Sequence, residues 1–170
     1  MADLPRTGIG VDVHQLVAGA HGPLQAKAYA AARRAVGVME VGGNNRGSKV
    51  LEIIRYAGGP GPEAWCVDFV IWCYGHAGST AVRRGFTRAV RYMHAAGLVT
   101  TAAPKRGDIV RYRFDHTGIF VKDNGNGTIT TIEGNTGRVG AVSDSRTGGD
   151  GVYIKVRSKT LVLDYLRVTH

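Results

Sequence analysis

Apolar residues recur at the three- to four-residue spacing of helices through the first half of the chain. Alanine dominates residues 25–36, which Gly37 ends, and Ser48 is a good N-cap for the apolar-rich stretch that it opens. The run AGGPGP then interrupts the chain before a strongly apolar stretch. This pattern predicts helices over residues 25–36, 48–56, 65–76 and 86–96.

Beyond Pro104 the pattern changes to short runs of β-branched and aromatic residues separated by Gly, Asn and Asp. The run DNGNG at residues 123–127 predicts a hairpin turn. Strands are predicted over residues 107–114, 116–123, 127–134, 138–143, 151–157 and 161–168. Helices followed by antiparallel strands describe an α+β fold. We therefore expect N-terminal helices packed on a C-terminal antiparallel sheet of about five to six strands.

The length of 170 residues suits a single domain with a substantial core. Residues 1–23 show little periodicity and are interpreted as an irregular N-terminal extension, which leaves residues 24–170 as the domain. No apolar run approaches the roughly 20 residues of a membrane-spanning helix. The start, MADLPRTGIG, lacks the basic and apolar regions of a signal peptide. We therefore expect synthesis in a host cytoplasm and delivery to the site of action by another route.

The chain is basic, with 22 Lys and Arg against 13 Asp and Glu and a net charge of +9. Such a charge suits a polyanionic partner, such as nucleic acid, an anionic membrane or an anionic cell wall. General solubility is the alternative explanation. The arginines are spread along the chain, and no helix-turn-helix or basic-arm pattern accompanies them. We therefore do not expect nucleic acid as the partner.

Two cysteines, Cys66 and Cys73, lie seven residues apart in the predicted helix 65–76. On a helix this spacing corresponds to a rise of about 10.5 Å, beyond the roughly 7 Å across which a disulfide forms. Together with His76 they lack the close pair of cysteines that is typical of a zinc site. The sequence therefore predicts neither a disulfide nor a metal site, and we expect no cofactor.

Cys66 has the position that a cysteine nucleophile requires. It lies in the first turn of its predicted helix, where free backbone N–H groups and the helix dipole favour a thiolate. The same N–H groups can hold an oxyanion when a carbonyl group is attacked. Cys73 lies two turns further on the same face and is interpreted as a small core residue. Trp65 either lines a substrate groove or packs in the core.

A cysteine nucleophile also needs a base, and the base needs a group that orients it. Among the six histidines, His116 differs because it opens the predicted strand 116–123, at an edge of the sheet that can face the helix. On the next predicted strand Glu133 and Asn135 are two residues apart, so both side chains should share one face. The hairpin can bring that face to His116, where one of the two would hold the imidazole.

Three motifs, EAWCVDFVIWCYGHAG, PKRGDIVRYRFDHTGIFV and TITTIEGNTG, follow one another in an order that resembles the CHAP family of papain-like cysteine peptidoglycan hydrolases. The upstream run EVGGNNRG resembles the Glu…Asn-Arg loop of some members, including phage lysins and actinobacterial proteins. The resemblance extends over roughly residues 28–168 and implies a papain-like fold. It implies four catalytic residues: Cys66 as nucleophile, His116 as base, Glu133 as orienting acid and Asn135 as an assisting residue.

The resemblance implies an endolysin-like enzyme that cleaves an amide bond of bacterial peptidoglycan. We expect this enzyme to be a monomer. The bond is that of an N-acetylmuramoyl-L-alanine amidase or of a peptide endopeptidase, and the residues do not separate the two. Some members bind calcium in an aspartate-rich loop before the cysteine, but here Glu63 is the sole carboxylate of that stretch, which is poor in calcium ligands. The alternative is a non-catalytic module that binds the cell wall or another polyanion with a degenerate papain-like fold.

Overall fold

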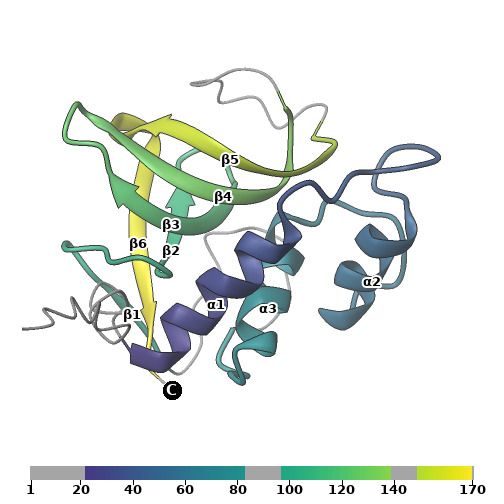
Figure 1. Ribbon diagram of the computed structural model, residues 1–170, viewed down its shortest axis with the longest axis horizontal. Helices are drawn as coiled ribbons and strands as arrows, with labels where there is room; N and C mark the ends of the chain where they lie inside the picture. Colours follow the sequence, from purple (N-terminus) through teal and green to yellow (C-terminus); the bar gives the residue numbers. More distant parts are fainter. Residues whose placement is uncertain (1–21, 83–96, 139–148, 170) are drawn as a thin grey trace, which may run out of the picture.

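The computed structural model describes residues 22–82, 97–138 and 149–169. In these residues helices precede an antiparallel six-stranded sheet (Figure 1). The helices are α1 (Gly22–Ala35), α2 (Ser48–Tyr56), α3 (Cys66–His76) and the 3-10 helix η3 (Lys159–Leu161). The strands are β1 (Leu98–Thr100), β2 (Ile109–Tyr112), β3 (Thr117–Asp123), β4 (Thr128–Thr136), β5 (Gly151–Ser158) and β6 (Val162–Val168). This arrangement confirms the predicted α+β class and fits a papain-like fold.

The strands lie in the order β1-β6-β2-β3-β4-β5. The predicted hairpin joins β3 to β4, and its turn contains Gly125 and Gly127 at φ values of 77° and 79°, which glycine adopts readily. The short strand β1 pairs with β6 and was not predicted. The helix predicted over residues 86–96 and nearly all of the strand predicted over 138–143 lie outside the described residues.

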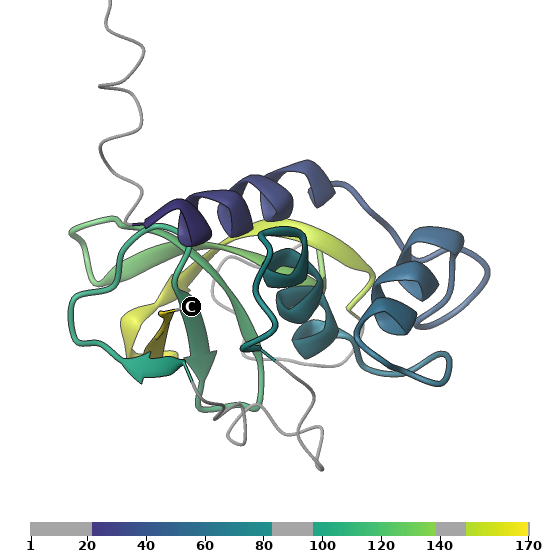
Figure 2. The ribbon, with the colours of Figure 1, turned by 90° about the horizontal axis from the view of Figure 1, so that it is seen from below.

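Helices α1 and α3 lie side by side against one face of the curved sheet, and α2 lies beyond α3 (Figures 1 and 2). The alanines of α1 explain how closely these elements pack. Ala28, Ala31, Ala32 and Ala35 lie at the spacing of one helix face and are at most 2% exposed. Small side chains on this face allow α1 to approach α3, and the core between helices and sheet includes Phe69, Ile119 and Ile132.

Two glycines permit close approaches beside the site, one between the sheet and α3 and one between two neighbouring strands. A Cβ atom on Gly134 would lie 2.6 Å from the Cβ and Cγ atoms of Phe69 in α3. A Cβ atom on Gly118 would lie 2.7 Å from the Cγ atom of Glu133, on the neighbouring strand. These glycines belong to the sequence motifs HTG and EGN, so each motif combines a polar side chain with a close approach of backbone. The glycines thereby bring β3, β4 and the start of α3 together.

None of the helices among the described residues has the length and apolar character required to cross a bilayer.

Candidate active site

Cys66 lies in the first turn of α3, as predicted, and is its first residue, whereas Trp65 is the N-cap and not the first helical residue. Its residue surface is 9% exposed, so the thiol lies at the boundary between the core and solvent. The Trp65 side chain does not cap the helix, and the first turn of an α-helix has backbone N–H groups without an intrahelical partner. A helix start of this kind stabilises negative charge on the sulfur or on a nearby oxygen.

His116 immediately precedes β3, and Glu133 lies in the middle of β4. The Nε2 atom of His116 lies 3.0 Å from the Oε2 atom of Glu133. The histidine is 4% exposed and the glutamate is fully buried, so water does not weaken this contact. A second hydrogen bond joins the imidazole to Cys66. The structure therefore brings the three residues Cys66, His116 and Glu133 together in a line.

The electrostatics of this line favour an imidazolium ion. Burial opposes protonation of His116, but its hydrogen bonds with Cys66 and Glu133 and the negative charges of both raise its pKa to about 9. For Glu133, burial favours the neutral acid, but contacts with His116 and Arg157 outweigh it and hold the pKa well below its usual range. At neutral pH the ring is a cation beside an anion. Because Nε2 binds Glu133, Nδ1 is the nitrogen left to face the sulfur.

Glu133 has further partners that sequence reasoning missed. Arg157 of β5 binds both carboxylate oxygens: Nη2 lies 2.5 Å from Oε2, and Nε lies 3.1 Å from Oε1. The hydroxyl groups of Tyr112 and Thr131 donate to Oε1 at 2.8 Å and 2.7 Å. The sequence shows an arginine in a predicted strand, but the pairing of β4 with β5 is what directs it toward Glu133. The carboxylate is therefore fixed on every side by donors.

Asn135 does not reach the ring. The β4–β5 register shifts between Glu133 and Thr136, and Asn135 has a φ of 53° at this bulge. Within the residues that the structure describes, Asn135 makes no hydrogen bond to His116. Thr136 instead shares the face of Glu133 and accepts a bond from Arg157 at 3.1 Å. The predicted alternation of Glu133 and Asn135 on one face is wrong because the bulge inserts an extra residue.

Trp65 lies in the core, which is one of the two placements that the sequence left open. It is fully buried, and its indole N–H donates to the Oε1 atom of Glu40 at 2.9 Å. The groove-lining role is therefore wrong for this conformation, because a side chain without exposed surface cannot contact a substrate. Glu40 belongs to the loop EVGGNNRG, so this loop holds the residue before Cys66 in place.

Both cysteines are free. Cys73 is fully buried, and burial raises the pKa of its thiol well above the ordinary value. Its placement agrees with the predicted role as a small core residue. In the described part of the chain, no cluster of three His, Cys, Asp or Glu side chains is arranged to hold a metal ion.

The family comparison agrees with this geometry. A family model of the CHAP domain matches residues 56–135, which run from the last residue of α2 to the bulge after Glu133. The matched segment contains Cys66, His116 and Glu133, and it confirms the resemblance to the CHAP family that the sequence predicted. CHAP domains are generally hydrolytic on peptidoglycan, as amidases or endopeptidases, and the match implies that substrate here. No curated protein and no solved structure gave a significant match.

Proposed function

We propose that this protein is a cysteine-dependent peptidoglycan hydrolase that cleaves an amide bond of the bacterial cell wall. The observation that carries the proposal is the line of three side chains from two different layers of the fold. Cys66 comes from the start of α3, whereas His116 and Glu133 come from the sheet. A cysteine, a histidine that hydrogen-bonds to it, and a carboxylate on the far ring nitrogen are the parts of nucleophilic acyl transfer.

In the first half of the reaction the Cys66 thiolate attacks the carbonyl carbon of the amide. A C–S bond forms, and the carbonyl electron pair moves to the oxygen, where the Cys66 N–H and the start of α3 stabilise the oxyanion. The His116 imidazolium then gives its proton to the leaving nitrogen as the C–N bond breaks. The product is a thioester on Cys66 and a free amine.

In the second half the neutral imidazole of His116 removes a proton from water, and the resulting hydroxide attacks the thioester. The C–S bond breaks, the carboxylic acid leaves, and the site returns to its starting charge state. Glu133 stabilises the imidazolium and holds its ring orientation throughout. Asn135 supports the site through its backbone, since asparagine tolerates the positive φ that the bulge after Glu133 requires.

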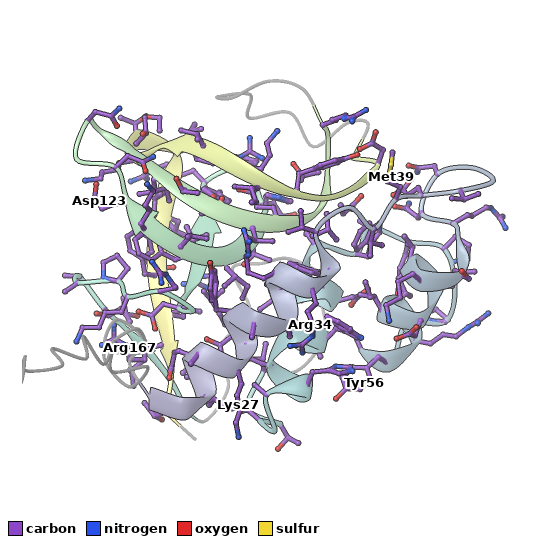
Figure 3. The ribbon with its side chains drawn as sticks, viewed as in Figure 1. Lys27, Arg34, Met39, Tyr56, Asp123 and Arg167 are labelled. Carbon is purple, nitrogen blue, oxygen red and sulfur yellow. The ribbon has the colours of Figure 1, made fainter. Side chains whose placement is uncertain are left out.

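The charge of the chain suits an anionic wall. The net charge is +9, and Lys27 and Arg34 are examples of exposed cations that project from α1 (Figure 3). Long-range attraction would concentrate the enzyme on wall polymers and raise its association rate. An endolysin-like role fits this picture, with synthesis in a host cytoplasm and release through a holin. A virion-associated lysin and an exported antibacterial effector are the other routes to the same substrate.

The experiment that tests the proposal is mass spectrometry of fragments released from purified peptidoglycan by the wild type and by Cys66→Ala. New L-alanine amino termini beside free lactyl groups on muramic acid would identify an amidase. New termini within the peptide or its crosslink would identify an endopeptidase. If a folded wild-type protein binds walls of several types and releases nothing, the proposal is wrong and a non-catalytic binding module is the better account.

A further inference from the structure

We propose that Arg157 is a positioning residue of this site, whose guanidinium completes an alternating row of buried charges behind the nucleophile. The proposal rests on the function proposed above. Arg157 comes from β5, an edge strand of the described sheet, and is 2% exposed. Its register partner on β4 is Ile129, so the side chain runs along the sheet to reach Glu133. A long cationic side chain is thus buried in the direction of the active site.

The guanidinium is held from several sides. Besides both oxygens of Glu133, its Nη2 atom donates to the Oγ1 atom of Thr136 at 3.1 Å. The rings of Tyr112 and Phe114 lie 5.7 Å and 5.6 Å from its central carbon, a distance at which an aromatic ring attracts a cation. A forked guanidinium on a carboxylate is more rigid than a lysine contact. Glu133 therefore cannot turn away from the imidazole without breaking these bonds.

The same two rings also contact the histidine. Tyr112 and Phe114 stack on each other at 5.0 Å, and each lies nearly parallel to the His116 ring, at 5.9 Å and 5.8 Å. Arg157 and His116 thus contact the same two aromatic rings and the same carboxylate. A shift of the guanidinium would move both these rings and the Glu133 carboxylate, which together hold the imidazole in place.

Counting charges shows what Arg157 adds. The Cys66 thiolate faces the His116 imidazolium, and that imidazolium faces the Glu133 carboxylate. Arg157 stands behind the carboxylate, so the hydrogen-bonded row contains two anions and two cations. Lys155 of β5 is also attracted to Glu133, but its ammonium group donates to the backbone oxygen of Gly137. Without the guanidinium, the two buried anions of the row would have a single hydrogen-bonded cation between them. Burying an uncompensated charge is costly, and one of the anions would take up a proton instead. Arg157 therefore allows the thiolate and the ionised Glu133 to coexist.

The readout is the pH dependence of Cys66 alkylation by iodoacetamide, followed on the Cys66 peptide by mass spectrometry. It needs no substrate, so it separates this proposal from the proposed function. In Arg157→Gln, which keeps polar donors but no charge, the acid midpoint of the rate profile should rise by about one pH unit. Arg157→Lys restores the charge without the fork, and its midpoint should return most of the way to the wild-type value.

Arg111→Gln is the matched control. Arg111 is 3% exposed and pairs with Asp164 between β2 and β6, so its loss should destabilise the fold while leaving the alkylation profile in place. Thermal denaturation would establish which variants are folded. If Arg157→Gln does not fold, Tyr112→Phe removes a neutral donor from the same carboxylate, and its midpoint should rise by a smaller amount.

A folded Arg157→Gln with the wild-type midpoint would overturn the proposal, as would the same shift in Arg111→Gln. If Arg157→Gln does not fold, a wild-type midpoint in folded Tyr112→Phe would also overturn it. These results leave the proposed function standing if the wild type still cleaves peptidoglycan. Conversely, a shifted midpoint in a protein that cleaves no wall would support the role of Arg157 in the row of buried charges and would contradict peptidoglycan as the substrate.

Discussion

A cysteine and a histidine lie near each end of α3, but the surroundings of the two pairs differ. At the N-terminal end, Cys66 lies beside first-turn N–H groups, and its histidine comes from the sheet with Glu133 behind it. At the C-terminal end, Cys73 is fully buried, and His76 belongs to the same helix. The reactive constellation lies at one end because the sheet supplies it there.

His76 serves a different purpose from His116. Its Nδ1 atom lies 2.9 Å from the backbone oxygen of Trp72, one turn earlier in α3. Its ring packs between Trp72 and Tyr56, with centroids 4.2 Å and 4.9 Å away. These contacts join the end of α3 to the end of α2. A cysteine and a histidine on one helix are therefore not sufficient for a nucleophile. The cysteine must lie at the N-terminal end of the helix, and its histidine must be able to carry a positive charge.

The largest effect should separate the two cysteines. Cys66→Ala removes the nucleophile, and wall hydrolysis should fall at least about a thousandfold. Cys73→Ala removes a buried thiol far from the carbonyl, so activity should stay within about twofold while the free energy of unfolding falls by roughly 1 kcal/mol. Turbidity loss of purified walls and thermal denaturation measure these quantities. Equal losses of activity in the two folded variants would contradict the assignment of Cys66 as the nucleophile and Cys73 as a core residue.

The two histidines should differ next. His116→Ala removes the acid-base partner and should lower the hydrolysis rate by about 100- to 10,000-fold. His76→Ala removes a surface ring from the α2–α3 contact and should leave the rate within about twofold of the wild type. Rates on soluble wall fragments measure this difference. A fully active His116→Ala would exclude the proposed proton transfer.

A smaller effect is expected for the carboxylate. Glu133→Gln replaces a charged hydrogen bond to His116 by a neutral one, and such a bond contributes about 1.5–3 kcal/mol, so the rate should fall roughly 10- to 100-fold. It should also lower the pKa of His116, because the neighbouring negative charge is lost. Asp164→Asn, in the Arg111 pair, is the control and should keep both values. An unchanged pH–rate profile in Glu133→Gln contradicts the assigned role.

The smallest effect is the pH limit of the wild type. The pKa of His116 is raised from 6.5 to about 9, so the imidazolium persists through neutral pH and activity should decline as pH rises through about 9. The same raised pKa contributes stability that is complete below about pH 6.5 and is lost as pH rises through about 9. A pH–rate profile and NMR of the His116 ring test both statements. A decline centred near pH 6.5 would mean that Cys66 and Glu133 do not hold the proton.

Local signals in the sequence were sufficient for much of the fold. The apolar spacing after Gly47 predicted α2 with its observed bounds, and the glycines of DNGNG predicted the β3–β4 turn. The predicted Ser48 cap is wrong, because Gly47 is the N-cap residue and no side chain caps this helix. The position of Cys66 in the first turn of α3 was predicted because the Gly- and Pro-rich run AGGPGP gives way to an apolar stretch just before it. Strand β1 has only three residues and forms by pairing with β6, which follows it by more than 60 residues, so no local pattern marks it.

The site was partly predictable for a related reason. Cys66 and His116 each stand at the start of a recognisable element, and Glu133 lies in the strand that the hairpin pairs with β3, so their meeting could be inferred from chain order. The position of Asn135 depends on a bulge, and the two-residue period of a strand does not reveal one. The contact of Arg157 with Glu133 depends on which strands are neighbours in the sheet. Strand register and strand pairing depend on residues far apart in the chain. For this reason the contact of Arg157 was missed and the side chain of Asn135 was misplaced.

The most direct test of the central claim is to treat the native wild type with iodoacetamide at neutral pH and follow labelling and wall hydrolysis together. The predicted result is alkylation of Cys66 while Cys73 stays unmodified, with activity falling in proportion to the labelled fraction of Cys66. Full wall hydrolysis by a protein whose Cys66 is completely alkylated would contradict the account, because the proposed nucleophile would then be blocked.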